Sequence, residues 1–243
     1  MPAHTSAPGR FLAFDTSTET LSVGVALGDR LWLHTGPGAA QASSTLIPSI
    51  LALLEQAGLS LRDLDAIVFG RGPGSFTGLR TACAVAQGLA FGSNRPVLAI
   101  DTLQAVAEAA RYAQPESTCI SAVLDARMNE VYVQHFRVEG SHLQALDDCQ
   151  LCAPEAVRWP DPGPAGRHRA AGNALAPYVG RLRELPPGSD WIEALPTAEA
   201  LLRLAPQQRA QAVPADQALP LYLRDKVALT TEERAAARAA APA

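Results

Sequence analysis

The sequence repeats one local order of elements, and this repetition limits the possible folds more than any other feature. Each half opens with an apolar strand, an aspartate (Asp15 or Asp125), a short polar turn and a hairpin. The strands predicted in the first half are 11–14, 21–27 and 30–35. Those predicted in the second half are 119–124, 131–138 and 142–149. We interpret the chain as a topological duplication that is visible in pattern and barely in identity.

Helical patterns follow each hairpin. In the first half we predict helices at 43–57, 79–91 and 103–111, with strands at 66–69 and 96–100. In the second half we predict helices near 153–158, 174–184 and 197–205, with a short strand at 168–171. An α/β protein with two halves of βββαβα order has the pattern of ribonuclease-H-like lobes, as in the actin, hexokinase and acetate-kinase superfamily. We expect lobes at 1–104 and 105–213, then an extended segment and a disordered tail at 214–243.

Composition excludes several classes of function. The 243 residues are 48% hydrophobic with a formal charge of −4, and Lys226 is the only lysine. This balance argues against independent, charge-driven binding of nucleic acid. No apolar run reaches membrane-spanning length and the N-terminus has no signal-like core, so we expect a cytoplasmic protein. The four cysteines and five histidines form no metal-ligand spacing, so we expect no metal and no cofactor.

A glycine-rich loop at 70–80 connects the 66–69 strand to the following helix. Glycine allows close backbone approach, and Ser75 and Thr77 can accept hydrogen bonds from the N–H groups at the helix start. A strand, a glycine turn and a helix N-terminus can form an anion site, or simply a tight connection without a ligand. The loop lacks the Gly-Lys-Ser/Thr of a P-loop and does not match the GxGxxG fingerprint.

In the superfamily, ATP phosphates lie near the two hairpins, but these hairpins are poorly suited to phosphate. No glycine lies between Asp15 and Leu21, and Met128 stands beside Arg127 at the second tip. The weak nucleotide or anion candidates are Asp15, Thr16, Ser17, Gly72, Gly74, Ser75 and Arg127. A nuclease would need several carboxylates around two metal ions, whereas the 66–69 strand ends at Gly70.

Four segments, taken in order, resemble the bacterial TsaB (YeaZ) family. They are Asp15-Thr-Ser-Thr-Glu, Gly72-Pro-Gly-Ser-Phe-Thr-Gly-Leu-Arg80, Leu124-Asp-Ala-Arg-Met-Asn-Glu-Val-Tyr132 and Pro220-Leu-Tyr-Leu-Arg224. The resemblance spans about residues 11–227. It implies a non-catalytic subunit of the complex that adds threonylcarbamoyl to the adenosine beside the anticodon in ANN-reading tRNAs. Its implied partners are the catalytic paralogue TsaD and the ATPase TsaE, with tRNA contacted mainly through the complex and a homodimer possible for the chain alone.

The paralogue offers an internal test. TsaD binds its metal with an HxxxH pair after the strand equivalent to 96–100, and Thr102 and Val106 occupy those places here. The chain therefore resembles TsaD without its chemistry. In the family, two helices of each subunit form the TsaB–TsaD contact. The interface candidates on the corresponding helices are Leu46, Ile50, Leu53, Leu54, Leu79, Ala82, Cys83, Ala86 and Ala90.

Two other functions stay open at this stage. A small-molecule kinase or ATPase of the same architecture would use Asp15, Asp125 and the glycine loop. A peptidase would need a nucleophile and a base, which the spacing of Ser17, Ser75 and the histidines does not reveal.

Overall fold

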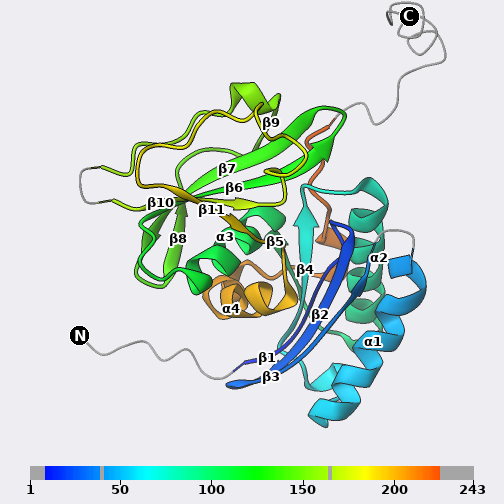
Figure 1. Cartoon of the computed structure of the whole chain (residues 1–243). Helices are drawn as coiled ribbons and strands as arrows, with labels where there is room; N and C mark the ends of the chain where they lie inside the picture. The colour runs from blue at the N-terminus through cyan, green and yellow to red at the C-terminus, as the bar shows by residue number, and fades with distance from the viewer. Residues whose placement is uncertain (1–8, 39–40, 164–165, 225–243) are drawn as a thin grey trace, which may run out of the picture.

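The computed structural model describes residues 9–38, 41–163 and 166–224, and they form two β-sheets with helices packed around them (Figure 1). The expected disordered tail falls mostly on 225–243, outside the described residues. No helix in the described part of the chain is long and apolar enough to cross a membrane.

Sheet A has the strand order β3-β2-β1-β4-β5. Its strands are β1 (Arg10–Asp15), β2 (Thr20–Leu27), β3 (Arg30–Pro37), β4 (Ala66–Gly72) and β5 (Val97–Asp101). The pairs β1–β2 and β2–β3 are antiparallel, whereas β4 runs parallel to both β1 and β5. The carboxyl ends of β1 and β4 therefore meet at one edge, where Asp15 and the glycine loop lie side by side.

Sheet B repeats this order as β8-β7-β6-β10-β11. Its strands are β6 (Cys119–Arg127), β7 (Glu130–Glu139), β8 (His142–Ala145), β9 (Gln150–Cys152), β10 (His168–Gly172) and β11 (Asp190–Glu193). Its first three strands are again antiparallel, and β10 is parallel to β6 and β11. The predicted duplication into two ribonuclease-H-like units is confirmed, and the turn after β6 is equivalent to the turn after β1.

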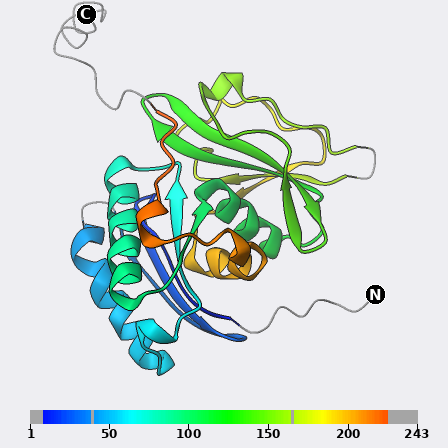
Figure 2. The ribbon, with the colours of Figure 1, turned by 180° about the vertical axis from the view of Figure 1, so that it is seen from behind.

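The helices divide between the faces of sheet A and the space between the sheets. Helices α1 (Ala42–Ala57) and α2 (Phe76–Ser93) cover one face of sheet A, and α4 (Ala198–Gln208) covers the other (Figures 1 and 2). Helix α3 (Thr102–Ala113) packs between α4 and sheet B. Short 3₁₀ helices lie at Leu61–Asp63, Pro154–Ala156, Arg209–Gln211 and Ala215–Gln217.

Apolar burial holds these layers together. Leu46, Ile50 and Phe69 are fully buried members of the apolar cluster between α1, α2 and sheet A. A second cluster joins Leu201 of α4 to the opposite face of the sheet, and a third joins α3 to sheet B. Burying a side chain of this size contributes about 1.5–3 kcal/mol. The two sheets are thus linked through α3 and α4, and the proposed boundary after residue 104 lies within α3.

The second half contains less helix than the sequence suggested. The helix expected at 174–184 is absent, and the chain there forms turns. Pro177 lies inside the segment and Gly180 has a φ of +77°, so neither residue favours a continuous helix. The strand expected at 142–149 spans only His142–Ala145 as β8, and β9 at Gln150–Cys152 lies beyond it. The segment 153–158 holds only a single 3₁₀ turn. Strand β11 was not predicted.

Candidate functional site: the pocket between the two turns

The turn after β1 is organised around the buried carboxylate of Asp15. Its Oδ1 accepts hydrogen bonds from Ser17 N (2.8 Å) and Ser17 Oγ (2.6 Å). The Thr102 hydroxyl donates to Oδ2 at 3.4 Å. Burial raises the pKa of Asp15 to about 6, although these hydrogen bonds act to lower it. Asp15 is fully buried, so it does not face the pocket described below.

The glycines of the loop allow it to pack directly on this turn. A Cβ at Gly70 would lie 1.8 Å from Asp15 Oδ2, and one at Gly78 would lie 1.9 Å from the Thr16 carbonyl oxygen. Thr16 Oγ1 in turn donates to the Gly78 carbonyl at 2.7 Å. These two glycines therefore have a packing reason within the chain itself.

The N-terminus of α2 is also occupied by the protein's own groups. Ser75 is the N-cap, and its Oγ accepts a 3.5 Å hydrogen bond from Gly78 N. The Ser75 N–H donates to the Ser17 carbonyl at 2.7 Å, and a Cβ at Gly74 would lie 2.6 Å from Ser17 Cβ. The start of α2 is thus fixed against the turn after β1. Anion binding here stays a prediction.

The equivalent turn between β6 and β7 is built differently. Arg127, Met128 and Asn129 all have left-handed backbone conformations, with φ of 61°, 56° and 63°. Asp125 Oδ1 accepts hydrogen bonds from Arg127 N and Tyr178 OH, both at 2.8 Å. Burial and this carboxylate raise the pKa of Tyr178 to about 12. The turn is therefore held by the aspartate that heads it, as the first turn is held by Asp15.

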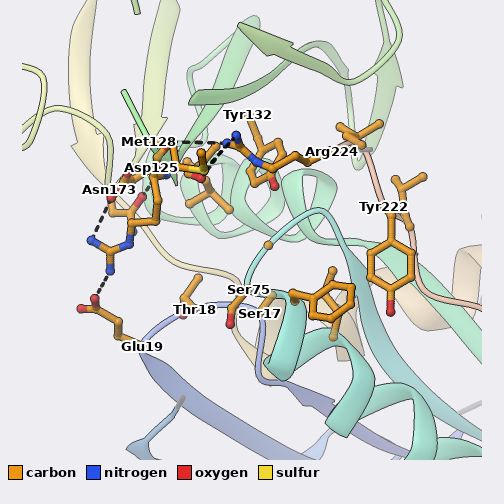
Figure 3. A pocket seen from close by; sticks show the side chains of 18 residues that line it. Ser17, Thr18, Glu19, Ser75, Asp125, Met128, Tyr132, Asn173, Tyr222 and Arg224 are labelled. Atoms are coloured by element: carbon orange, nitrogen blue, oxygen red, sulfur yellow. Dashed lines mark hydrogen bonds and ion pairs between the residues drawn. The ribbon is translucent and has the colours of Figure 1, made fainter. Parts of the chain in front are cut away.

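Arg127 joins the two turns. Its guanidinium forms an ion pair with Glu19 of the first turn and lies 3.1 Å from Asp125 Oδ2 (Figure 3). Both carboxylates compete with any phosphate for this cation.

The C-terminal segment crosses from α2 to the second turn and forms one wall of the site (Figure 2). Leu221 N donates to the Arg71 carbonyl at 2.7 Å, and the Tyr222 ring lies 5.3 Å from the Phe76 ring. Arg224 donates to the Ala126 carbonyl at 3.1 Å and pairs with Glu130 at 2.6 Å.

These elements enclose a pocket of about 380 Å³ (Figure 3). Its lining combines hydroxyl, carboxylate and guanidinium groups with apolar and aromatic side chains. The lining residues are Ser17, Thr18, Glu19, Gly74, Ser75, Phe76, Leu79, Leu124, Asp125, Ala126, Arg127, Met128, Tyr132, Asn173, Leu221, Tyr222, Leu223 and Arg224. Among the anion candidates, Ser17, Gly74, Ser75 and Arg127 line it. Asp15, Thr16 and Gly72 are buried behind its wall.

Sequence reasoning about the site omitted Tyr132, Asn173, Tyr222 and Arg224, which all line the pocket. Two of them belong to the Pro220-Leu-Tyr-Leu-Arg224 segment that carried the family resemblance. The segment could therefore have pointed to these two site residues. However, its position over the turns depends on contacts with residues about a hundred positions away in the sequence.

The nine interface candidates on the two helices all point into the chain. Each is at most 6% exposed: Leu46, Ile50, Leu53, Leu54, Leu79, Ala82, Cys83, Ala86 and Ala90. The apolar residues that α1 and α2 expose are different from these nine candidates. Ile47 and Leu51 of α1 are 43% and 52% exposed, and Phe91 of α2 is 85% exposed. Ala84 and Gly88, which precede Phe91 by about two turns and one turn of α2, are also exposed. We call these five residues the helix face.

The described residues contain no group of three or more histidine, cysteine, aspartate or glutamate side chains placed to hold a metal ion. Thr102 and Val106, at the positions of the paralogue's histidine pair, are both fully buried. The Thr102 hydroxyl accepts a hydrogen bond from Gly72 N at 3.1 Å and so supports the glycine loop.

Sheet B contains a buried chain of polar side chains that resembles a peptidase triad. Ser121 Oγ lies 2.7 Å from His135 Nδ1, and His135 Nε2 lies 3.7 Å from Asp147 Oδ2. However, Ser121 is fully buried, and its hydroxyl also lies 2.8 Å from His168 Nε2. The hydroxyl is held between two imidazoles with no access for a substrate, so the chain of groups is structural.

Two sheets of ribonuclease-H-like order, with a pocket where their equivalent turns meet, define a two-lobed α/β protein of the actin, hexokinase and acetate-kinase class. The family model "TsaD: tRNA N6-adenosine threonylcarbamoyltransferase" matches residues 38–192. The chain belongs to the TsaB (YeaZ) family, as three relatives show.

The first relative is "tRNA threonylcarbamoyladenosine biosynthesis protein TsaB" of Haemophilus influenzae, which is 37% identical over 230 residues, 89% of this chain and 94% of that protein. The protein of the same name from Escherichia coli is 33% identical over 224 residues, 90% of this chain and 96% of its own length. The solved structure "YeaZ from Pseudomonas aeruginosa" is 38% identical, with a TM-score of 0.81 over 88% of this chain and 100% of that one.

Proposed function

We propose that this chain takes part in threonylcarbamoyladenosine formation on tRNA as a non-catalytic subunit that binds and activates TsaD. Family membership supports the pathway, because the curated relatives carry the name of that biosynthesis. The polar groups at the two turns form hydrogen bonds and ion pairs mainly with one another. This supports a role in which the chain itself catalyses no reaction. In this role TsaE joins the pair and tRNA is contacted mainly through the assembled complex.

The helix face carries the proposal. Ile47 and Leu51 of α1 and Phe91 of α2 are large apolar side chains exposed on the outer layer of sheet A. Contiguous exposed apolar surface on a folded protein commonly marks a protein interface. Helices α1 and α2 lie side by side on this outer layer in both views (Figures 1 and 2). We therefore place the TsaD contact on the exposed face of these helices instead of on the buried candidates.

Gly88 adds a second reason. Glycine in a helix interior costs about 1 kcal/mol relative to alanine. Yet a Cβ at Gly88 would meet no atom within 4 Å, so nothing within the described residues requires glycine there. A small residue beside Ala84 allows another helix to approach closely. A partner helix packed on α2 would account for it.

Replacement of an exposed helix-face residue tests the contact. Ala86 is fully buried, so a charge there would damage the fold; Gly88→Arg places the charge on the surface instead. Ala113→Arg adds the same side chain at an exposed position of α3 and serves as the control. Mixed with TsaD of the same organism, Gly88→Arg should abolish co-elution, whereas Ala113→Arg should retain it. With TsaE, ATP, tRNA and a threonylcarbamoyl donor added, Gly88→Arg should also abolish transfer to the tRNA, and Ala113→Arg should not. Equal behaviour of the two variants would remove the helix face from the contact.

The kinase or ATPase alternative makes a separate prediction. It requires the pocket to bind Mg-ATP, whereas Arg127 is already paired with Glu19 and Asp125. Calorimetry on the chain alone should show no micromolar binding of Mg-ATP and no hydrolysis. Both signals together would favour the alternative.

A further inference from the structure

Strand β5 is the edge strand of sheet A, and part of its outer edge is open. Ile67 N donates a hydrogen bond to the Pro96 carbonyl. In the parallel register that follows, the backbone groups of Leu98 and Ile100 point toward β4. Val97 and Ala99 therefore direct their backbone groups to the outer edge. Val97 exchanges two hydrogen bonds of 2.8 Å with Val213. The N–H and C=O of Ala99 have no backbone or side-chain partner in the described part of the chain.

The chain turns away from this edge where it could have continued along it. The Val97–Val213 bridge is antiparallel, so an extended strand would place Gln211 opposite Ala99. Residues Arg209–Gln211 instead form a 3₁₀ helix. A groove of about 540 Å³ lies beside Ala99, and its lining includes His142 and Leu143 of β8, the edge strand of sheet B.

The groove has walls rich in side-chain amides. Five glutamines line it: Gln104, Gln207, Gln208, Gln211 and Gln217. Gln208 donates to Gln104 at 3.0 Å and Gln207 donates to the Ser141 carbonyl at 3.2 Å. The other side-chain amide groups of the five glutamines have no hydrogen-bond partner among the described residues. Each amide can both donate and accept, as a peptide main chain does.

The charge of the groove does not suit a polyanion. Arg71 lines it, but its guanidinium is paired with Asp101 of the same groove. Apart from His142, the described residues that line the groove include no other basic side chain. Nucleic-acid sites instead collect several unpaired cations along a phosphate backbone.

We propose that this groove binds an extended, uncharged peptide segment of another protein. The segment pairs with the outer edge of β5 as an added strand and continues the backbone pairing that Val213 begins. The segment exchanges main-chain hydrogen bonds with Ala99, and the glutamine amides bond to its remaining peptide groups and polar side chains. An open sheet edge is a ready template for such strand addition. The groove is separate from the helix face and from the pocket between the turns.

Hydrogen exchange on the isotope-labelled full chain tests the open edge first. The amide of Ala99 should exchange at least about tenfold faster than those of Leu98 and Ile100, which β4 protects. A heptapeptide selected from a random phage-displayed library on the immobilised chain is then the probe. When bound, it should slow exchange at Ala99 by about tenfold or more.

A double variant locates the probe. Gln211→Leu with Gln217→Leu removes two wall amides and should weaken the heptapeptide at least about tenfold. Gln56→Leu changes an exposed glutamine of α1 and should leave its affinity unchanged. The proposal fails if Ala99 is already as protected as its neighbours, if no selected peptide alters its exchange, or if the double variant binds normally. Stronger protection of Ala99 by a twelve-nucleotide oligouridine than by any peptide would also overturn it. None of these measurements uses TsaD, so the result is independent of the proposed function.

Discussion

Arg127 and Glu19 form an ion pair that connects the equivalent turns of the two sheets. Each residue follows the aspartate that heads its own turn, Asp15 for Glu19 and Asp125 for Arg127. The two side chains are 68% and 78% exposed. In this pair a guanidinium that lines the pocket is bound to the protein's own carboxylate.

Loss of this pair should change stability little. Exposed ion pairs contribute about 0.2–1 kcal/mol, so Arg127→Ala should lower the free energy of unfolding by no more than about 1 kcal/mol. Arg62→Ala, at an exposed arginine of a short 3₁₀ helix, is the control for the loss of a surface charge. Urea denaturation measures both. A loss above about 2 kcal/mol for Arg127→Ala alone would mean that the pairs of Arg127 with Glu19 and Asp125 are major supports of the fold.

The glycine loop should tolerate no side chain where it meets Asp15. Gly70→Ala places a Cβ 1.8 Å from Asp15 Oδ2 and should destabilise the fold by about 2–4 kcal/mol. The same replacement at Gly88 meets open space and should stabilise the isolated chain by up to about 1 kcal/mol. Thermal unfolding of the two variants distinguishes these opposite signs. Similar melting temperatures would contradict the close packing of the loop on the turn.

Stability should fall in mild acid because of His168. Burial, helped by the charges of His135 and Arg169, lowers its pKa from 6.5 to about 4. The unfolded chain therefore binds the proton first, and the stabilisation is present above pH 6.5 and lost as the pH falls toward 4. Between pH 7 and pH 5 this amounts to about 2 kcal/mol. Burial also lowers the pKa of His135, which faces Asp147 and Ser121 in the same cluster.

Replacement of His168 checks this dependence. His168→Gln can still bond to Ser121 but does not titrate, so its stability should vary less between pH 7 and pH 5 than that of the natural chain. His34→Gln, at an exposed position of β3, is the control. An unchanged acid dependence in His168→Gln would assign the effect to other groups.

Asp15 should act in the opposite direction. Its pKa is raised by burial to about 6, so the folded chain takes up the proton first and gains stability as the pH falls from 6 toward 3.8. Asp15→Asn removes the cost of a buried charge and should stabilise the chain at pH 7 by about 1–3 kcal/mol. It should also make the acid loss caused by His168 steeper. Destabilisation at pH 7 would show that the charged hydrogen bonds from Ser17 outweigh burial.

The strands and hairpins could be predicted because their apolar runs and turns are local signals. The prediction of a helix at 174–184 was wrong because Pro177 and Gly180 disfavour a helix there. The apolar residues of this segment pack on sheet B from a series of turns. Strand β11 was missed because Asp190-Trp-Ile-Glu193 is too short to show a period. Its parallel pairing with β10 is a tertiary contact that sequence cannot supply.

The site was less predictable than the fold. Both helices of the outer layer are apolar on more than one side, and sequence alone could not say which stripe covers the sheet. The buried stripe includes Leu46 and Ala86, whereas Ile47 and Gly88 face outward. The pocket likewise depends on Arg224, which meets the turn after β6 only when the chain has folded.

Size-exclusion chromatography with light scattering on this chain mixed with TsaD of its own organism tests the central claim most directly. The account predicts a complex with the mass of one copy of each chain, formed equally by Ala113→Arg and lost in Gly88→Arg. Separate elution of the two natural proteins at micromolar concentration would contradict it.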